Sequence, residues 1–372
     1  MAERARGGVV LSTVLPGLPQ LLAGRIWVGA TALWMWLAGL IVFVSRTDRI
    51  SAAFGAGSGT GRAALGVLLA AGLAWAWSLR DISESDVSES PRADGGIIFR
   101  LFDDQWAAAG LFILSVFAWL LVAVPLLAPE GGLRSLAFEP FRPPSWTNPM
   151  GTDRVAADVF HRFLLGARAT LGVGVLAGLG GSVLGVAVGS VAGFAGRGVD
   201  RALMRIVDFF IALPKLVLLI AVVGVLAPTP FVLGLFIAFV QWPALARIVR
   251  GDVAAIRERE FVKALGALGL SRKRVLLMHV LPNVQPTILV GTVLAVANAM
   301  LIEAGLGFLG LGMGGDNYEA SWGVLIRDGA DLWNHWWIGG FAGLSLVAVV
   351  VALNLVADAV RDEFDPRARI SV

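Results

Sequence analysis

Long apolar stretches separated by short polar segments dominate this chain. A helix that crosses a lipid bilayer needs about 20 mostly apolar residues, and eight segments approach that length. They lie near residues 26–45, 63–79, 106–128, 169–192, 206–226, 230–246, 284–305 and 338–357. The segments at 63–79 and 206–226 fit the pattern least, because the first is short and the second contains charged residues and Pro214. The pattern predicts an all-α polytopic membrane protein.

Basic residues in the loops predict which side of the membrane each loop faces. The segment 247–283 contains eight Arg and Lys residues, whereas 306–337 contains Arg327 alone. We therefore expect 247–283 to be a cytoplasmic loop and 129–168 to be an external loop. With eight spans, both termini are then expected in the cytoplasm.

A change of composition divides the chain near residues 80–104. Charged residues there stand among Ser, Pro and Gly, which is typical of a linker. We expect residues 1–95 to form an accessory two-helix membrane hairpin with a charged linker. Residues 96–372 are expected to form a six-helix body.

Composition supports the membrane assignment. With 57% apolar and 15% charged residues and a mean hydropathy of +0.78, the chain is far from the averages of soluble domains. The net charge is +3, and in a membrane chain basic residues mark loops that face anionic lipid. No basic patch is interleaved with aromatic residues in the way that nucleic-acid binding requires. A lipid bilayer, and not nucleic acid, is the expected partner.

The sequence offers no catalytic motif. It has no cysteine, which excludes disulfides, thiolate metal sites and cysteine nucleophiles. It has no phosphate-binding loop of the form GxxxxGKS or GxxxxGKT. His161, His279 and His335 match no metal-ligand spacing. We expect no catalytic residue, no metal and no cofactor, so any driving energy must come from elsewhere.

The basic loop at 247–283 is too long for a simple turn. At helical period it presents one apolar face, formed by Ile256, Phe261, Ala264, Leu265 and Leu268. Gly269 is expected to end this helix, and Ser271 to cap a second helix that runs through Val275. Two interpretations stay open: the helix lies on anionic headgroups, or it docks on a partner protein.

The letters of this loop, REFVKALGALGLSRKRVLLMHVLPN at 259–283, resemble the EAA loop of ABC importer permeases. In that family the loop forms a coupling helix that docks in a groove of the ATPase subunit. By position, the motif's Glu-Ala-Ala corresponds to Lys263, Ala264 and Leu265, and its glycine to Gly269. Lys263 departs from the family's glutamate. The resemblance implies that the following residues couple the chain to an ATPase: Arg259, Glu260, Phe261, Lys263, Ala264, Leu265, Gly269 and Ser271.

Four further segments are similar to the second, C-type permease subunit of dipeptide, oligopeptide and nickel importers. They are NPMGTDRVAADVFHRFLLGARATL at 148–171, VDRALMRIVDFFIALPKLVL at 199–218, EAGLGFLGLG at 303–312 followed by Ser321, Trp322 and Gly323, and NLVADAVRDEFDPR at 354–367. Ala156 and Ala157 stand where the family usually has Gly-Arg. The resemblance covers roughly residues 100–370. It implies the six-helix core of a type I importer.

The same resemblance implies a set of partners and a location. The partners are a homologous permease subunit, two ABC ATPase subunits and an external solute-binding protein. The location is the cytoplasmic, or inner, membrane of a bacterium or archaeon. The expected function is to form the translocation path for peptides or a similar small solute. The alternative is a self-sufficient secondary transporter or channel, which would need charged or broken helices at mid-membrane and internal inverted repeats.

Two sets of residues in the body have more than one interpretation. Glycines recur every four residues and form a stripe without side chains, at Gly181, Gly185, Gly189 and Gly193. This stripe predicts close helix packing, with lining of the path as the alternative. Glu303 stands beside Gly305 near a predicted span end. A carboxylate there indicates a pathway or gate residue, or a solvated or capped side chain.

Overall fold

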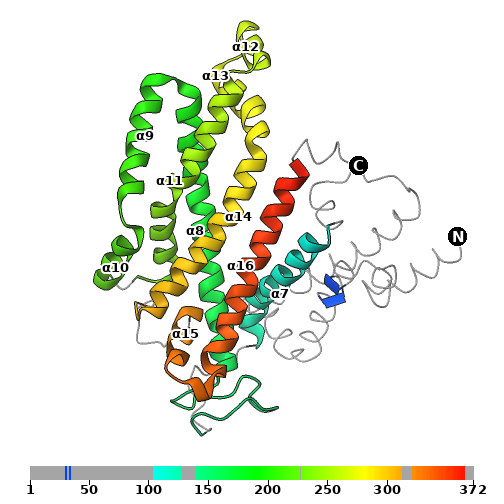
Figure 1. Ribbon diagram of the computed structural model, residues 1–372, viewed down its shortest axis with the longest axis vertical. Helices are drawn as coiled ribbons and strands as arrows, with labels where there is room; N and C mark the ends of the chain where they lie inside the picture. Colours follow the sequence, from blue (N-terminus) through cyan, green and yellow to red (C-terminus); the bar gives the residue numbers. More distant parts are fainter. Residues whose placement is uncertain are drawn as a thin grey trace, which may run out of the picture. The chain divides into compact units, whose positions relative to one another are not determined.

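The computed structural model describes residues 104–127, 139–226, 228–311 and 321–364, together with residues 30, 31, 33 and 34. Helices dominate these residues (Figure 1), and the bridge between Thr152 and Asp158 is isolated, outside any strand of the described chain. The all-α fold class is therefore confirmed. The predicted span at 63–79 and nearly all of the predicted hairpin and linker at 1–95 lie outside the described residues.

Four stretches of the described chain are long and apolar enough to cross a membrane. They are α8 (Val159–Ala195), α11 (Pro230–Arg257), the continuous helix Arg272–Phe308 and α16 (Trp337–Phe364). The third of these consists of α13 (Arg272–Val275), a π-helical segment (Leu276–Val280) and α14 (Leu281–Phe308). A further apolar helix, α7 (Gln105–Leu127), coincides with the span predicted at 106–128.

The span predicted at 206–226 is not one straight helix. The chain forms α9 (Arg197–Ala212) and α10 (Lys215–Leu226), which are bent by 73°. Leu213 is extended, with φ −72° and ψ 133°, because the ring of Pro214 disfavours a helical conformation in the residue before it. Counted together, the two helices make a fifth candidate span in the described chain.

Two helices extend beyond the predicted apolar segments. α8 begins at Val159 instead of residue 169, and α11 continues to Arg257 instead of ending near residue 246. The added residues include Arg, Ala and Val, which are not apolar enough as a group to mark a span but are compatible with a helix. The non-helical part of the 247–283 segment is correspondingly shorter than the sequence predicts.

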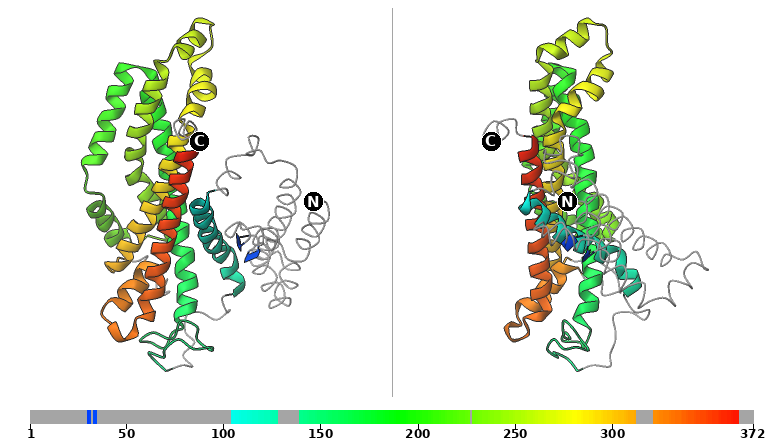
Figure 2. Two further views of the ribbon diagram at one scale, coloured as in Figure 1. Left: turned by 45° about the vertical axis from the view of Figure 1, so that its right-hand side comes forward. Right: turned by 90° about the vertical axis from the view of Figure 1, so that its right-hand side faces the viewer.

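The chain divides into two compact units. Unit 1 comprises Met1–Arg168 with Val347–Ala359, and unit 2 comprises Ala169–Leu346 with Val360–Val372. Within unit 2, the short helices α12 (Glu260–Ala267) and α13 lie at one end, and α15 (Trp322–Ala330) lies at the other (Figures 1 and 2). The boundary predicted near residue 95 stays a prediction.

Two apolar clusters form the core of unit 2. The first joins α8, α10, α11 and α14 through Val173, Ala177, Leu219, Val223, Leu233, Ile237, Val240, Ala299 and Leu306. The second lies toward the α12 end and consists of Leu245, Val249, Val253, Ile256, Val262, Val275, Val280 and Val284. Van der Waals packing of such side chains holds helices together where the surrounding lipid is equally apolar.

The glycine stripe of α8 faces α11. A Cβ atom added at Gly185 would lie 2.8 Å from the carbonyl oxygen of Trp242, and one at Gly193 would lie 2.7 Å from that of Arg250. At Gly181 the nearest atom is Cγ of Gln241, at 2.9 Å. Backbone therefore lies directly on backbone along the contact between α8 and α11.

Candidate functional site

The segment between α11 and α14 is a helix, a tight turn and a second short helix. Gly269 has φ +82°, a left-handed conformation that favours glycine. Its N–H donates to the carbonyl of Gly266 at 3.1 Å, and the N–H of Leu270 donates to the carbonyl of Leu265 at 3.3 Å. This pair of bonds is a Schellman motif, which ends α12 and turns the chain toward α13.

The apolar residues predicted to share one face of this loop separate into two groups. Ile256 belongs to α11 and is buried in the second core cluster, against which Leu265 also packs. Phe261, Ala264 and Leu268 are exposed. The prediction of a single face is wrong because α11 ends at Arg257 and the turn that follows breaks the helical phase.

Val262 is the residue that anchors α12, and the predicted apolar face of the loop did not include it. Its side chain is 6% exposed and lies in the second core cluster with Val275 and Val280. Val262 and Leu265 are three residues apart, so they share one side of α12. This three-residue spacing is the feature of the sequence that could have identified the buried side of α12. The outward side carries Phe261, 42% exposed, and Leu268, 75% exposed.

The polar residues of the loop lie at its surface. Arg259 precedes α12 without a side-chain cap, and Glu260 is exposed in its first turn. Ser271 precedes α13, but its hydroxyl caps no backbone N–H, which corrects the predicted capping role. Lys263 forms an ion pair with Glu258 at 3.3 Å, and both side chains are about two-thirds exposed, at 63% and 66%.

Lys263→Glu should leave the fold of α12 intact, and it tests the predicted contact of α12 with an ATPase. Exposed ion pairs contribute only about 0–1 kcal/mol to stability, so loss of the pair with Glu258 has a small effect on unfolding. A charge reversal changes any docking surface more strongly. We expect reduced ATP hydrolysis in a reconstituted complex with cognate ATPases and an unchanged unfolding midpoint.

Glu258→Gln is the matched control for this variant, because it removes the same ion pair without reversing the charge on α12. If Lys263→Glu raises transport with the native ATPases, the lysine is a tolerated deviation and no partner has adapted to it.

At the opposite end of unit 2, Glu303 is buried. The residue is 2% exposed, and its carboxyl group is hydrogen-bonded to the hydroxyls of Thr170 and Ser321. The Thr170 hydroxyl accepts from the N–H of Trp322 at 3.1 Å, and the Ser321 hydroxyl accepts from that of Val324 at 3.3 Å. Both hydroxyl hydrogens are therefore directed at Glu303. Its Oε2 atom has no hydrogen-bond partner among the described residues.

Glycines allow α15 to approach α14 closely at this place. A Cβ atom on Gly307 would lie 2.8 Å from the Ser321 hydroxyl oxygen. One on Gly323 would collide with the backbone of Ala304. Trp322, with 0% exposure, is fully buried. The close packing of α15 on α14 thus explains Gly307 in the EAGLGFLGLG segment and Gly323 in the SWG segment.

The structure does not bring Glu303 and Gly305 together on one surface. Glu303 is directed into the α15 contact, whereas a Cβ atom on Gly305 would meet nothing within 4 Å. Two residues along a helix are about 200° apart, so they face different sides. Because Glu303 is buried, it lines no accessible path in this conformation, and its gate role stays a prediction.

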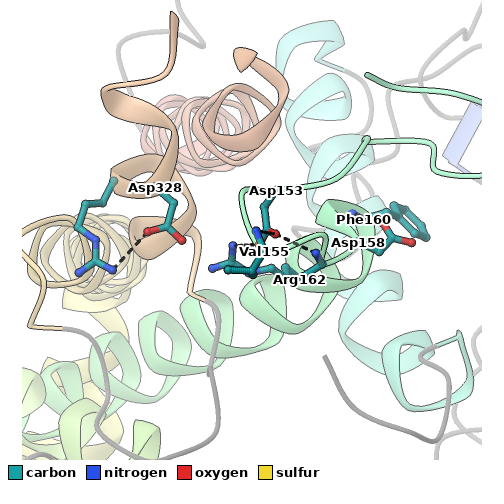
Figure 3. Close-up of polar contacts among 8 residues, drawn as sticks. Asp153, Val155, Asp158, Phe160, Arg162 and Asp328 are labelled. Carbon is teal, nitrogen blue, oxygen red and sulfur yellow. Dashed lines mark hydrogen bonds and ion pairs between the residues drawn. The ribbon is translucent and has the colours of Figure 1, made fainter. Parts of the chain in front are cut away.

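A buried ion pair organises the chain before α8 in unit 1. The Asp153 carboxylate accepts from the N–H groups of Val155 and Ala157, at 2.9 and 2.8 Å, and from Nη1 of Arg162 at 2.7 Å (Figure 3). Ala156 has φ +59°, a conformation that costs a residue with Cβ about 1–2 kcal/mol. The glycine that the resemblance implies at this position would adopt this conformation without that cost.

No group of three or more His, Cys, Asp or Glu side chains in the described ranges is placed to hold a metal ion. His161 lies on α8, His279 in the π-helical segment, and His335 in a 3-10 turn at Trp333–His335.

Residues 185–370 match the family described as "Binding-protein-dependent transport system inner membrane component". The dipeptide transport system permease protein DppC of Bacillus subtilis is 36% identical over 272 residues, which cover 73% of this chain and 84% of that protein. DppC of Alkalihalophilus pseudofirmus is 34% identical over 271 residues, covering 73% and 88%. The oligopeptide transport system permease protein OppC of B. subtilis is 32% identical over 273 residues, covering 73% and 89%.

These relatives and the apolar helices establish a multi-pass inner-membrane protein. The similarity to the relatives extends over most of their length. The chain therefore belongs to the binding-protein-dependent inner-membrane permeases of ABC importers, in the dipeptide and oligopeptide family.

Proposed function

We propose that α12 is the surface through which an ATPase drives this permease. The observation that carries this proposal is the exposed apolar side of α12, formed by Phe261, Ala264 and Leu268. Exposed apolar clusters on a helix mark contacts with another protein. A large aromatic residue such as Phe261 is a typical binding anchor at a protein interface.

The buried side of α12 makes it a mechanical link. Val262 and Leu265 pack into the cluster that includes residues of α11, α13 and α14. Movement of a partner that holds Phe261 would therefore be transmitted to two long apolar helices. Packed interiors have low compressibility and transmit strain, so a rigid displacement of α12 should reach the membrane region.

The proposed assembly contains a homologous permease subunit, two ATPase subunits and an external solute-binding protein. Relatives named for dipeptide and oligopeptide transport support a peptide as the solute. The α12 end is proposed to face the cytoplasm, in agreement with the basic residues of 247–283. Both termini would then also face the cytoplasm.

A self-sufficient transporter or channel would leave the exposed side of α12 without a protein partner. That side would then rest on the membrane surface as an amphipathic helix. The relatives named as transport-system permeases favour the ATPase-driven alternative. The two hypotheses differ in whether Phe261 is needed for contact with an ATPase.

The test is the double variant Phe261→Ser with Leu268→Ser, purified with its cognate ATPases. Truncation of an aromatic anchor at an interface costs about 2 kcal/mol or more. We expect ATPase co-purification and solute-stimulated ATP hydrolysis to fall by roughly 30-fold, a factor that corresponds to that energy. Insertion of the chain in the membrane should be unchanged, because both side chains are exposed.

Ile248→Ser is the matched control, since Ile248 is also an exposed apolar residue, 53% exposed, but lies on α11. Gly269→Val provides a second arm, because valine is strained at φ +82° and should displace α12. Unchanged ATPase co-purification in both the double variant and Gly269→Val would refute the proposed contact.

A further inference from the structure

Arginines form a regular stripe on the first half of α9. Arg197, Arg201 and Arg205 are four residues apart, so they lie on one side of the helix. Together with Arg250 of α11 they line a pocket of about 330 Å³, whose other lining residues are Asp200, Met204 and Asp208.

The acidic residues of this pocket are already neutralised. Asp200 forms a two-pronged ion pair with Arg250, in which Nε lies 2.9 Å from Oδ1. Asp208 pairs with Arg247. No ion pair involves the three stripe arginines in the part of the chain that the structure describes. The pocket therefore keeps a surplus of positive charge, which favours an anionic ligand.

An exposed apolar surface continues the arginine stripe. Phe209 follows Arg205 by four residues and is 62% exposed, and Ile206 beside it is 49% exposed. The other side of α9 packs on α11 through Val207, with 0% exposure, and Phe210. The outer surface of α9 thus has cationic groups toward one end and apolar groups toward the middle of the helix pair.

The position of the pocket along the helices agrees with a membrane interface. Arg250 lies in the last two turns of α11, which ends at Arg257, directly before α12. The arginines therefore lie at the α12 end of unit 2, where long apolar helices give way to polar loops. Anionic headgroups are found at this level of a bilayer, and basic pockets between membrane helices bind them.

From these observations we infer that the pocket binds the phosphate headgroup of an anionic glycerophospholipid, with an acyl chain along Phe209. An acidic protein surface would pair with the arginines but would leave the apolar continuation of the stripe without a contact. A phospholipid satisfies both parts, since its phosphate meets the guanidinium groups and its acyl chain covers Ile206 and Phe209. Arginine suits such a phosphate because its planar fork donates two hydrogen bonds at once.

The experiment uses the purified full-length chain in detergent, incubated with phosphatidylglycerol or phosphatidylcholine of identical acyl chains. Retained lipid is counted by native mass spectrometry. We expect phosphatidylglycerol to be retained more strongly than phosphatidylcholine. In Arg201→Gln with Arg205→Gln its affinity should fall by about 30-fold, since each basic residue near anionic lipid contributes about fivefold. Lysine at both positions should restore most of the binding.

Arg272→Gln with Arg274→Gln is the matched control, because it removes two exposed arginines of α13 at the same end of unit 2. Equal phosphatidylglycerol retention in the stripe variant and in this control would overturn the inference. Displacement of the lipid by excess inorganic phosphate would overturn the acyl-chain contact and leave a phosphate site only. Loss of ATPase co-purification with unchanged lipid binding would identify the pocket as a protein contact, against the inference.

Discussion

Gly189→Ala should lower the stability of the chain by about 1–3 kcal/mol, the usual cost of forcing an added methyl group into a close-packed contact. A Cβ atom at position 189 would lie 2.5 Å from the carbonyl oxygen of Ala246 and 3.0 Å from Cβ of Val249. The nearest of these atoms belongs to the backbone, so no side-chain rotation relieves the collision. α8 and α11 would have to move apart. This lowers stability, because dispersion contacts between the two helices hold them together in lipid.

Gly172→Ala is the control for this prediction. Gly172 lies on the same helix, but a Cβ atom there would meet nothing within 4 Å. Alanine is about 1 kcal/mol more favourable than glycine inside a helix, so this variant should be neutral or stabilised. The measurement is the thermal unfolding midpoint of each variant in one detergent. Equal midpoints for the two variants would contradict the close contact between α8 and α11.

Span positions were accessible from the sequence because a bilayer requires about 20 apolar residues in a row. The ends of the helices could not be predicted in this way, because a search for about 20 apolar residues in a row detects only the apolar part of a helix. The residues of α11 beyond 246 show the reason. Arg247 and Arg250 interrupt the apolar run, yet each remains helical and pairs with an aspartate of α9. Such pairs join positions far apart in the chain, which periodicity does not reveal.

Within the coupling segment, Gly269 was predictable since a glycine directly after an apolar helix indicates a left-handed C-terminal turn. The buried and exposed sides of α12 were not predictable from one continuous helical period. The turn at Glu258 changes the phase between α11 and α12, so Ile256 and Phe261 lie on different sides. Only the packing of Val262 in the second core cluster decides which side of α12 faces outward.

The residues that contact Glu303 in the folded chain could not be predicted from the sequence either. Thr170 belongs to α8 and Ser321 precedes α15, and only tertiary packing places both hydroxyls on one carboxyl group. The sequence identified a carboxylate in an apolar segment, which is costly without partners. The sequence did not indicate that the same two hydroxyls also accept from backbone N–H groups at the start of α15. Thr170 accepts from Trp322, and Ser321 accepts from Val324.

Glu303→Leu should weaken the packing of α15 on α14, so that α15 detaches from α14 more often. Leucine fills a similar volume but accepts no hydrogen bond, so two buried hydroxyl donors lose their acceptor, at about 1–3 kcal/mol each. Glu303→Gln keeps a carbonyl oxygen for these donors and should have a smaller effect. The chain has no cysteine, so a single Leu325→Cys substitution on α15 can report exposure of this side chain, which has 0% exposure in the folded chain.

Thiol labelling at that cysteine measures how often α15 opens, since labelling of a buried group requires local unfolding. With Glu303→Leu we expect the labelling rate to rise by roughly 100-fold, the factor that corresponds to losing about 3 kcal/mol of local stability. Glu258→Leu is the control, because it removes an exposed carboxylate at the α12 end and should not change the rate. Thr170→Val, which removes one hydroxyl donor and the acceptor for Trp322, should also accelerate labelling. Equal rates in Glu303→Leu and Glu258→Leu would show that α15 is held by its glycine and tryptophan contacts alone, without the carboxyl group.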